Sequence, residues 1–265
     1  MIVTFLGTGT STGVPQIGCT CDVCLSEDQR DKRFRSSILI ETDDNKRILV
    51  DCTPDFRTQI LNFIKPLATA ESDFPIYPID CMLLTHGHSD HMGGIDDLRP
   101  SALFGQVPIY AESVVADDIR QRLAYCFSEN KYPGIPKLKL CPINENEVVA
   151  VGDTSIEPLR VYHGDLPILG FKIGKKFAYI TDMKSIPEPT LQKLYGVEVL
   201  VLNALRMRPH PTHQTIEDAI LLSEKIGAKR TYLTHLSHEA GMHENSTSFL
   251  PVGVEFAYDG LQIKL

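Results

Sequence analysis

The feature that most constrains this chain of 265 residues is where its predicted strands end. Runs of apolar and β-branched residues predict strands throughout the sequence. Several of these runs stop at a polar residue of the kind that binds metals or accepts hydrogen bonds: Asp51, His86, His163, Asp182, Asn203 and His235. Side chains that follow strands on a rigid sheet scaffold can meet on one rim. We therefore expect a fold whose strands present these ends to a single site.

Strands and helices alternate in both halves of the chain. Strands are expected at 2–7, 36–42, 46–51, 79–85, 108–111, 154–163, 168–174, 176–182, 197–203 and 229–235, with a C-terminal hairpin turning at Asp259-Gly260. Helices are expected at 54–64, 112–127, 187–195 and 215–227. Because no linker or internal repeat is visible, we expect one domain over residues 1–265, with two sheets flanked by helices.

The charge composition of the chain limits which classes of molecule it can be expected to bind. The net charge is −8 and no long basic run is present, so a nucleic acid held by clustered Lys and Arg is disfavoured. A small anionic substrate remains compatible if a local positive site, such as a metal, attracts it. The start MIVTFLGTGTSTG does not read as a secretory signal, and no apolar run reaches the roughly 18 residues of a membrane span. We expect a cytoplasmic protein without a membrane segment.

The segment LLTHGHSDHMGG at 83–94 concentrates potential metal ligands. In an extended chain His86 and His88 point the same way and can bind one metal. Asp90 and His91 come after the turn and can face a second metal. Neutral imidazoles with carboxylates suit Zn²⁺, Mn²⁺ or Fe. A surface polar loop is the alternative, but four ligand-type residues within six positions favour a metal site.

HGHSDH matches the H-x-H-x-D-H signature of the metallo-β-lactamase superfamily, and the resemblance covers nearly the whole chain. The resemblance implies an α/β fold of the αββα sandwich type, with two mixed β-sheets flanked by helices. It also implies a dinuclear site with the ligands His86, His88 and His163 on one metal, Asp90, His91 and His235 on the other, and Asp182 between them. Asp51 would orient ligands from behind the site.

A pair of metals held in this way can lower the pKa of a bridging water toward neutral and hold it as hydroxide. They also neutralise charge that builds on a phosphoryl or acyl oxygen. The cofactors expected in the active site are therefore two divalent ions, Zn²⁺ or Mn²⁺, and the chemistry expected is hydrolysis. We expect Asp90, Asp182 and His213 to carry catalysis.

The cysteine-rich stretch GCTCDVC at 18–24 predicts a separate structural zinc site. Structural zinc takes four ligands, so Cys19, Cys21 and Cys24 need a partner, and YLTHLSHEAGMHEN offers His238 and His243. The cluster resembles that of a subgroup that includes the phosphoribosyl cyclic phosphate phosphodiesterase. That resemblance assigns His238 to the zinc and leaves His243 at the surface. Three reduced free thiols are the alternative. The scattered cysteines are expected to pack as small hydrophobic residues: Cys52, Cys81, Cys126 and Cys141.

The segment RMRPHPTHQTIEDAI supplies two further histidines ahead of a predicted helix. The departing alkoxide of a phosphodiester needs a proton, and a positioned acid contributes about 10²–10⁴-fold. Relatives in the subgroup have a histidine at the position of His213, as an acid or a phosphate ligand. His210 matches the pattern less well, and a solvent-facing loop histidine is the alternative interpretation of His213.

The function expected is a metal-dependent phosphodiesterase that hydrolyses small phosphodiesters, including cyclic ones. A thioester hydrolase of the glyoxalase type would use the same ligands. A tRNA 3′-processing nuclease is a near relative, but the acidic chain has no obvious basic exosite arm. From another class, the chain could be a non-catalytic metal-bound carrier, like the related protein of pyrroloquinoline quinone biosynthesis, which also has such a cysteine cluster. A homodimer is compatible with the sequence.

Overall fold

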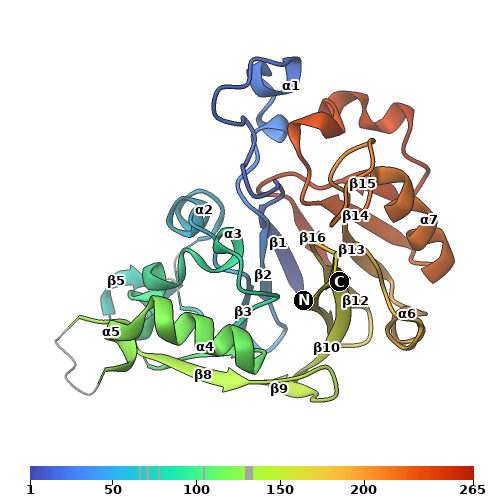
Figure 1. Ribbon diagram of the computed structural model, residues 1–265. Coiled ribbons are helices and arrows are strands. Elements are labelled where there is room, and N and C mark those ends of the chain that lie inside the picture. Colours follow the sequence, from blue (N-terminus) through green and yellow to red (C-terminus); the bar gives the residue numbers. More distant parts are fainter. Residues whose placement is uncertain (66, 70–71, 77, 104, 129–133) are drawn as a thin grey trace.

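The computed structural model describes residues 1–65, 67–69, 72–76, 78–103, 105–128 and 134–265. Two seven-stranded sheets form its centre (Figure 1). The first sheet has the order β16 (Gln262–Lys264), β1 (Ile2–Gly7), β2 (Ser37–Glu41), β3 (Arg47–Val50), β6 (Cys81–Leu83), β7 (Val107–Ala111) and β8 (Leu138–Pro142). The second has the order β15 (Val254–Phe256), β14 (Arg230–Thr234), β13 (Val199–Asn203), β12 (Phe177–Ile180), β11 (Leu166–Ile173), β10 (Thr154–His163) and β9 (Val149–Val151).

Both sheets are mixed. In the first sheet β1 pairs with β2 and β2 with β3 in antiparallel orientation, whereas β3, β6, β7 and β8 run parallel to one another. In the second sheet β10, β11 and β12 are antiparallel, and β12 to β15 are parallel. A separate pair, β4 (Leu67–Thr69) and β5 (Ser72–Ile76), lies outside both sheets.

Apolar side chains fill the space between the sheets and cover their outer faces. Phe5 and Ile38 of the first sheet share one buried cluster with Phe171 and Phe177 of the second. A second apolar cluster lies on the outer face of the first sheet and includes residues of α2 (Phe56–Phe63) and α4 (Ser113–Arg122). A third apolar cluster lies on the outer face of the second sheet and includes residues of α6 (Glu188–Leu194) and α7 (Ile216–Ile226). This layering confirms the predicted αββα sandwich.

Local signals set the bounds of α7 closely. The Thr215 side chain accepts a hydrogen bond from the Asp218 backbone, and the Asp218 side chain accepts one from the Thr215 backbone, which satisfies amides at the start of the helix. Gly227 ends the helix with a φ of 74°. The remaining short helices are α1 (Asp22–Leu25), α3 (Ser89–Met92) and α5 (Ala124–Phe127), with 3₁₀ turns at Gln29–Asp31, Ile95–Leu98, Ser101–Leu103, His238–Ala240 and His243–Ser248.

Two expectations about the elements are wrong. The helix predicted at 112–127 is broken at Leu123, where the backbone leaves the helical region, and continues as α5. The predicted C-terminal hairpin does not form, because β15 pairs with β14 in the second sheet and β16 pairs with β1 in the first. The Asp259-Gly260 turn therefore carries the chain from one sheet to the other. Strands β8 and β9 were not predicted.

None of the described helices combines the length and the apolar character needed to cross a membrane.

Candidate metal centre

Three of the predicted site residues end their strands in a strained backbone conformation. Asp51 follows β3 with a φ of 60°, Asp182 follows β12 with a φ of 57°, and His235 follows β14 with a φ of 56°. Among the described non-glycine residues, only Asn45 shares this left-handed conformation. Such a residue costs on the order of 1–3 kcal/mol and persists where its surroundings hold it. The turn directs each of these side chains to the rim where β3, β12 and β14 end.

Asp51 fixes the orientation of the histidine loop from behind. Its fully buried carboxylate accepts hydrogen bonds from the Thr85 backbone at 2.9 Å, the Thr85 hydroxyl at 3.0 Å and His91 Nδ1 at 2.7 Å. The Thr85 hydroxyl also lies 2.9 Å from His86 Nδ1. Because Nδ1 of His91 is engaged, its Nε2 is the nitrogen presented to the site. Sequence reasoning missed Thr85, which precedes the histidine motif and carries no ligand chemistry of its own.

Four of the predicted ligands converge at the rim: Asp90, His91, Asp182 and His235, with ligand atoms within 4.8 Å of one another. Asp182 lies between the two imidazoles, with Oδ2 3.2 Å from His91 Nε2 and Oδ1 3.1 Å from His235 Nε2. Both of these buried nitrogens have no hydrogen-bond partner among the described residues. Unpaired nitrogens facing two carboxylates fit the donor set that Zn²⁺, Mn²⁺ or Fe prefers.

The other three predicted ligands lie beside this group. His86 Nε2 is 2.9 Å from His88 Nδ1, and the His88 ring centroid is 5.3 Å from that of His163. The His163 Nδ1–H donates to the Thr212 carbonyl at 2.9 Å, which leaves Nε2 as the ligand nitrogen. The sequence-predicted ligands are thus adjacent, although His86 and His88 face each other directly.

Burial and the carboxylates set the charges of the site. Burial lowers the pKa of His86 well below its usual value, so this imidazole is neutral. Burial opposes a charge on His91 as well, but Asp182 and Asp51 raise the pKa of His91 well above its usual value. Although burial opposes ionisation of Asp182, His235 and His91 lower the pKa of that carboxyl. A divalent ion would meet the neutral imidazole of His86 and the ionised carboxylate of Asp182, and it would have to replace the proton that the carboxylates favour on His91.

His213 lies against the same cluster. It is 8% exposed, its Nδ1 is 4.0 Å from Asp182 Oδ1, and one of its ring atoms falls within 4.8 Å of ligand atoms of both His163 and Asp182. Burial and the neighbouring His235 lower the pKa of His213 to about 3. His210 lies next to this histidine, and its ring centroid is 5.0 Å from that of His213. His213 is buried and does not face solvent, whereas His210 is partly exposed in the same loop.

Glycines in the opening GTG segment let the chain pass close to the rim. A Cβ at Gly7 would lie 2.0 Å from the Arg35 carbonyl oxygen, so no larger residue fits there. Thr8 and Thr10 then hydrogen-bond to the backbone of Leu236, next to His235. The N-terminal segment is thereby tied to the strand that carries a predicted ligand.

The predicted cysteine ligands meet His238 at the top of the molecule, where α1 projects from the sheets (Figure 1). His238 Nδ1 is 3.4 Å from Cys19 Sγ and 3.3 Å from Cys21 Sγ. The Cys24 amide and His238 lower the pKa of Cys21 to about 6, whereas burial raises the pKa of Cys24 to about 11. Three sulfurs and one nitrogen within 4.8 Å fit a tetrahedral zinc. We call residues 10–33 the cysteine lobe.

His243 is not the surface residue that the sequence suggested. It is partly buried, its ring contacts those of Phe256 and Tyr258, and its Nδ1 is 3.5 Å from Arg33 Nη2. The four scattered cysteines differ in exposure: Cys52, Cys81 and Cys126 are buried, and Cys141 is partly exposed.

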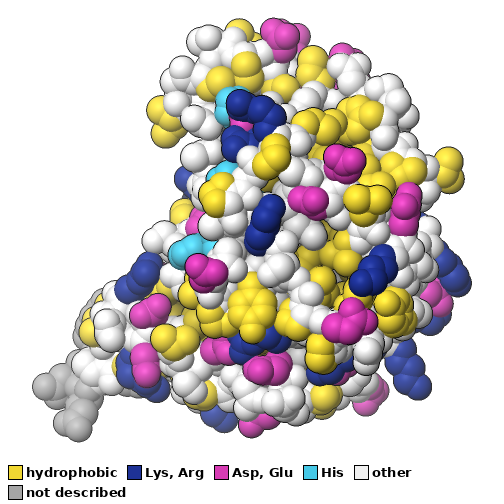
Figure 2. Space-filling view, turned by 45° about the vertical axis from the view of Figure 1, so that its right-hand side comes forward, with side chains coloured by type: hydrophobic (Ala, Val, Ile, Leu, Met, Phe, Trp, Pro, Cys, Tyr) yellow, Lys and Arg dark blue, Asp and Glu magenta, His cyan; other side chains and the backbone are white. Residues whose placement is uncertain are grey.

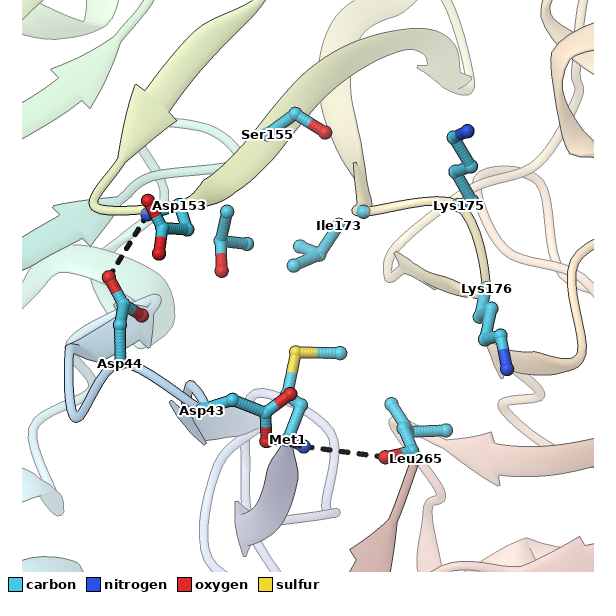
Figure 3. A pocket seen from close by; sticks show the side chains of 11 residues that line it. Met1, Asp43, Asp44, Asp153, Ser155, Ile173, Lys175, Lys176 and Leu265 are labelled. Carbon is cyan, nitrogen blue, oxygen red and sulfur yellow. Dashed lines mark hydrogen bonds and ion pairs between the residues drawn. The ribbon is translucent and has the colours of Figure 1, made fainter.

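Histidine side chains line the hollowed left edge of the molecule, with Lys and Arg side chains among them (Figure 2). A cavity of about 620 Å³ lies elsewhere, at the ends of β1, β2 and β11 away from the rim, and Asp43, Asp153 and Lys175 contribute to its walls (Figure 3). None of the predicted site residues lines that cavity.

Comparisons with known proteins agree with this geometry. Residues 46–236 match the model of the beta-lactamase superfamily domain. A crystal structure of a diphosphatase from the PhnP family is 37% identical, with a TM-score of 0.87, and the match covers 100% of this chain and 97% of that one. The Zn²⁺-bound PqqB structure from Methylobacterium extorquens is 22% identical, with a TM-score of 0.83 and full coverage of both chains, which shows the fold alone.

Among curated proteins, the octanoyltransferase of Porphyromonas gingivalis is 49% identical over 258 residues. That match covers 97% of this chain and 50% of the relative, so the chain spans about half of the relative's length. The coenzyme PQQ synthesis protein B of Methylorubrum populi is 27% identical over 245 residues, covering 86% of this chain and 78% of that protein.

Proposed function

Because this chain belongs to the beta-lactamase superfamily and has its metallo-hydrolase fold, we propose that it is a dinuclear metal-dependent phosphodiesterase acting on small anionic phosphodiesters, including cyclic ones. The observation that carries the proposal is the convergence of Asp90, His91, Asp182 and His235, with two buried imidazole nitrogens left without a hydrogen-bond partner among the described residues. The likeness to a diphosphatase over the full chain favours phosphoryl rather than lactam chemistry.

The proposed ligands form two sets joined by Asp182. His86, His88 and His163 would hold one divalent ion, and Asp90, His91 and His235 the other. Such a pair would supply Lewis-acid polarisation of a phosphoryl oxygen and activation of a water. The identity of the ions, Zn²⁺ or Mn²⁺, stays a prediction, as does a homodimer.

The protein's own residues orient these groups and handle the leaving group. Asp51 holds His91, and the Thr212 carbonyl holds His163, so both imidazoles present Nε2. His213 lies beside Asp182 and would contact a phosphoryl oxygen or, once the anionic substrate has raised its low pKa, give a proton to the departing alkoxide. In the cysteine lobe, Cys19, Cys21, Cys24 and His238 would hold a structural zinc.

Thioester hydrolysis is a second candidate, favoured by the relative named octanoyltransferase. Acyl and phosphoryl transfer both build negative charge on an oxygen that the same site could stabilise. The name belongs to a protein about twice as long as the match, so it supports this candidate less than the diphosphatase likeness supports phosphodiester hydrolysis.

A substrate panel separates the candidates. Protein loaded separately with Zn²⁺ and Mn²⁺ would be assayed with bis(p-nitrophenyl) phosphate, a nucleoside 2′,3′-cyclic phosphate and an octanoyl thioester. We expect hydrolysis of the phosphodiesters, and preference for the thioester would overturn the proposal. Inertness toward all of them would favour a carrier.

Asp90→Ala should reduce phosphodiester hydrolysis at least about 100-fold while circular dichroism shows an unchanged fold. Asp153→Ala is a matched control, because this carboxylate lines the cavity away from the rim. A wild-type rate in Asp90→Ala would refute the ligand assignment.

A further inference from the structure

The 3₁₀ turn His238–Ala240 contacts the cysteine lobe on one side. His238 Nδ1 lies 3.4 Å from Cys19 Sγ and 3.3 Å from Cys21 Sγ, and α1 packs against the turn. Glu239 is the next residue of the same three-residue turn. Because consecutive residues of so short a turn share one set of backbone hydrogen bonds, the position of Glu239 follows that of His238.

The same segment is hydrogen-bonded to the loop at 204–215, which joins β13 to α7 without helix or strand and carries His213. The Ser237 amide donates to the Leu205 carbonyl at 3.0 Å, and the Ser237 hydroxyl donates to the same oxygen at 2.9 Å. The Glu239 amide donates to the Ser237 hydroxyl at 3.2 Å. These three hydrogen bonds hold the turn against the beginning of the loop.

The Glu239 carboxylate holds the next part of this loop through two arginines. Its oxygens pair with Arg206 and with Arg208. The Arg206 pair is the stronger restraint, because the Arg206 side chain is 25% exposed and that of Arg208 is 73% exposed, and ion pairs in water contribute little. Arg206 also donates to the carbonyls of Arg208 and Pro209, both at 3.3 Å. The carboxylate therefore fixes a guanidinium that fixes the loop backbone.

The far part of the loop contacts the proposed metal centre. The Thr212 carbonyl accepts from His163 Nδ1 at 2.9 Å, and His213 Nδ1 lies 4.0 Å from Asp182 Oδ1. A shift of the loop would therefore move His213 relative to Asp182. A misplacement of about 1 Å can cost about 10²-fold in rate, even when it originates far from the reacting atoms.

Resting on the phosphodiesterase function proposed above, we propose that Glu239 is a positioning residue that couples the cysteine site to the reaction centre. A filled cysteine site would fix the turn that carries Glu239, and Glu239 would transmit this restraint through Arg206 to the loop at 204–215. The loop would then hold His213 in place for the reaction. Emptying the cysteine site would slow hydrolysis, although none of its ligands belongs to the reaction centre.

Hydrogen exchange followed by mass spectrometry tests the coupling without turnover. Glu239→Gln keeps the size of the side chain and removes its charge. We expect amides at 204–215 to exchange at least about tenfold faster in this variant, as the loss of a hydrogen bond between charged groups implies. His238→Ala should loosen the same loop, and adding Glu239→Gln to it should have little further effect, because both changes interrupt one path. Glu239→Asp should retain part of the protection.

Glu244→Gln is the matched control, since this exposed carboxylate lies on the next 3₁₀ turn and should leave exchange at 204–215 unchanged. Wild-type exchange in Glu239→Gln, or effects of Glu239→Gln and His238→Ala that simply add, would overturn the coupling.

Hydrolysis of a nucleoside 2′,3′-cyclic phosphate by metal-loaded protein tests whether Glu239 acts through His213. We expect Glu239→Gln to lower kcat/KM at least about tenfold in the wild-type background and to have little effect in a His213→Ala background. Equal losses in the two backgrounds would overturn the positioning role. Faster loop exchange in Glu239→Gln, in a protein that hydrolyses no phosphodiester, would support the coupling and reject the proposed function. Phosphodiesterase activity with unchanged loop exchange in Glu239→Gln would reject the coupling alone.

Discussion

Removing one ligand of the proposed zinc site should unfold the cysteine lobe, while the αββα sandwich stays folded. The lobe has little apolar support of its own: Val14, Val23 and Cys24 are its buried hydrophobic residues, and partly buried Cys19, Cys21 and Met242 pack against them. A fully buried side chain of this kind contributes about 1.5–3 kcal/mol. A structural zinc contributes about 10–16 kcal/mol in isolated peptides. The metal is therefore the larger of the two contributions to the lobe.

The rest of the molecule does not depend on that contribution. The three large apolar clusters between and outside the sheets share no residue with the lobe. Cys21→Ser and His238→Ala should therefore each lose one zinc per chain while the metals at the rim remain. Amide exchange should become fast at 10–33 and stay slow in β10 and β11. The midpoint of thermal unfolding of the sandwich should also fall, but by less than it would if the sandwich depended on the lobe for its stability.

Elemental analysis and hydrogen exchange followed by mass spectrometry would measure these effects. Cys141→Ser is a matched control, because this thiol lies on β8, outside the lobe, and has only a weak contact with the Lys139 carbonyl at 3.7 Å. It should lose no zinc. Unchanged zinc content in both lobe variants, or a lobe that stays protected without its zinc, would refute the reasoning.

Two further predictions concern single side chains. His213→Ala should slow hydrolysis strongly when the leaving group is an alkoxide and less when it is nitrophenolate, because only the alkoxide needs a proton; equal losses in the two rates would indicate phosphate binding instead. Burial raises the pKa of Asp259 to about 7, so folding favours the protonated form and stability should fall as pH rises from about 4 to 7. Urea unfolding at pH 5, 6 and 7 should show this slope in wild type and a flatter one in Asp259→Asn; equal slopes would rule out Asp259 as its source. His243, near Arg33 in the same region, has a pKa lowered to about 4 and would act in the opposite direction, which is why the variant comparison is needed.

Much of the fold could be predicted because its signals are local. Thr215 and Gly227 mark the ends of α7 through hydrogen bonds and backbone angles within the helix itself. The apolar runs around Ile38 and Val201 are buried on both faces, which is why they stand out as strands. The ligand motif at 86–91 is equally local, since one loop supplies His86, His88, Asp90 and His91.

Tertiary structure decided the features that depend on distant segments. The Asp259-Gly260 pair resembles a hairpin turn, but the following strand pairs with β1, more than 250 residues earlier in the chain, because the turn carries it across to the other sheet. The left-handed conformations of Asp51, Asp182 and His235 likewise exist only where neighbouring strands hold them.

By itself, the sequence determined which residue types are present for chemistry and which strands would carry them toward a common rim. The sequence did not determine how the two histidines of RPHPTH, His210 and His213, would be oriented relative to the predicted ligands. Thr212 orients His210 and at the same time holds His163, and that double contact exists only after β10 and the loop before α7 have packed together. His163 and Thr212 are about 50 positions apart in the chain, so no local spacing in the sequence encodes the hydrogen bond between them.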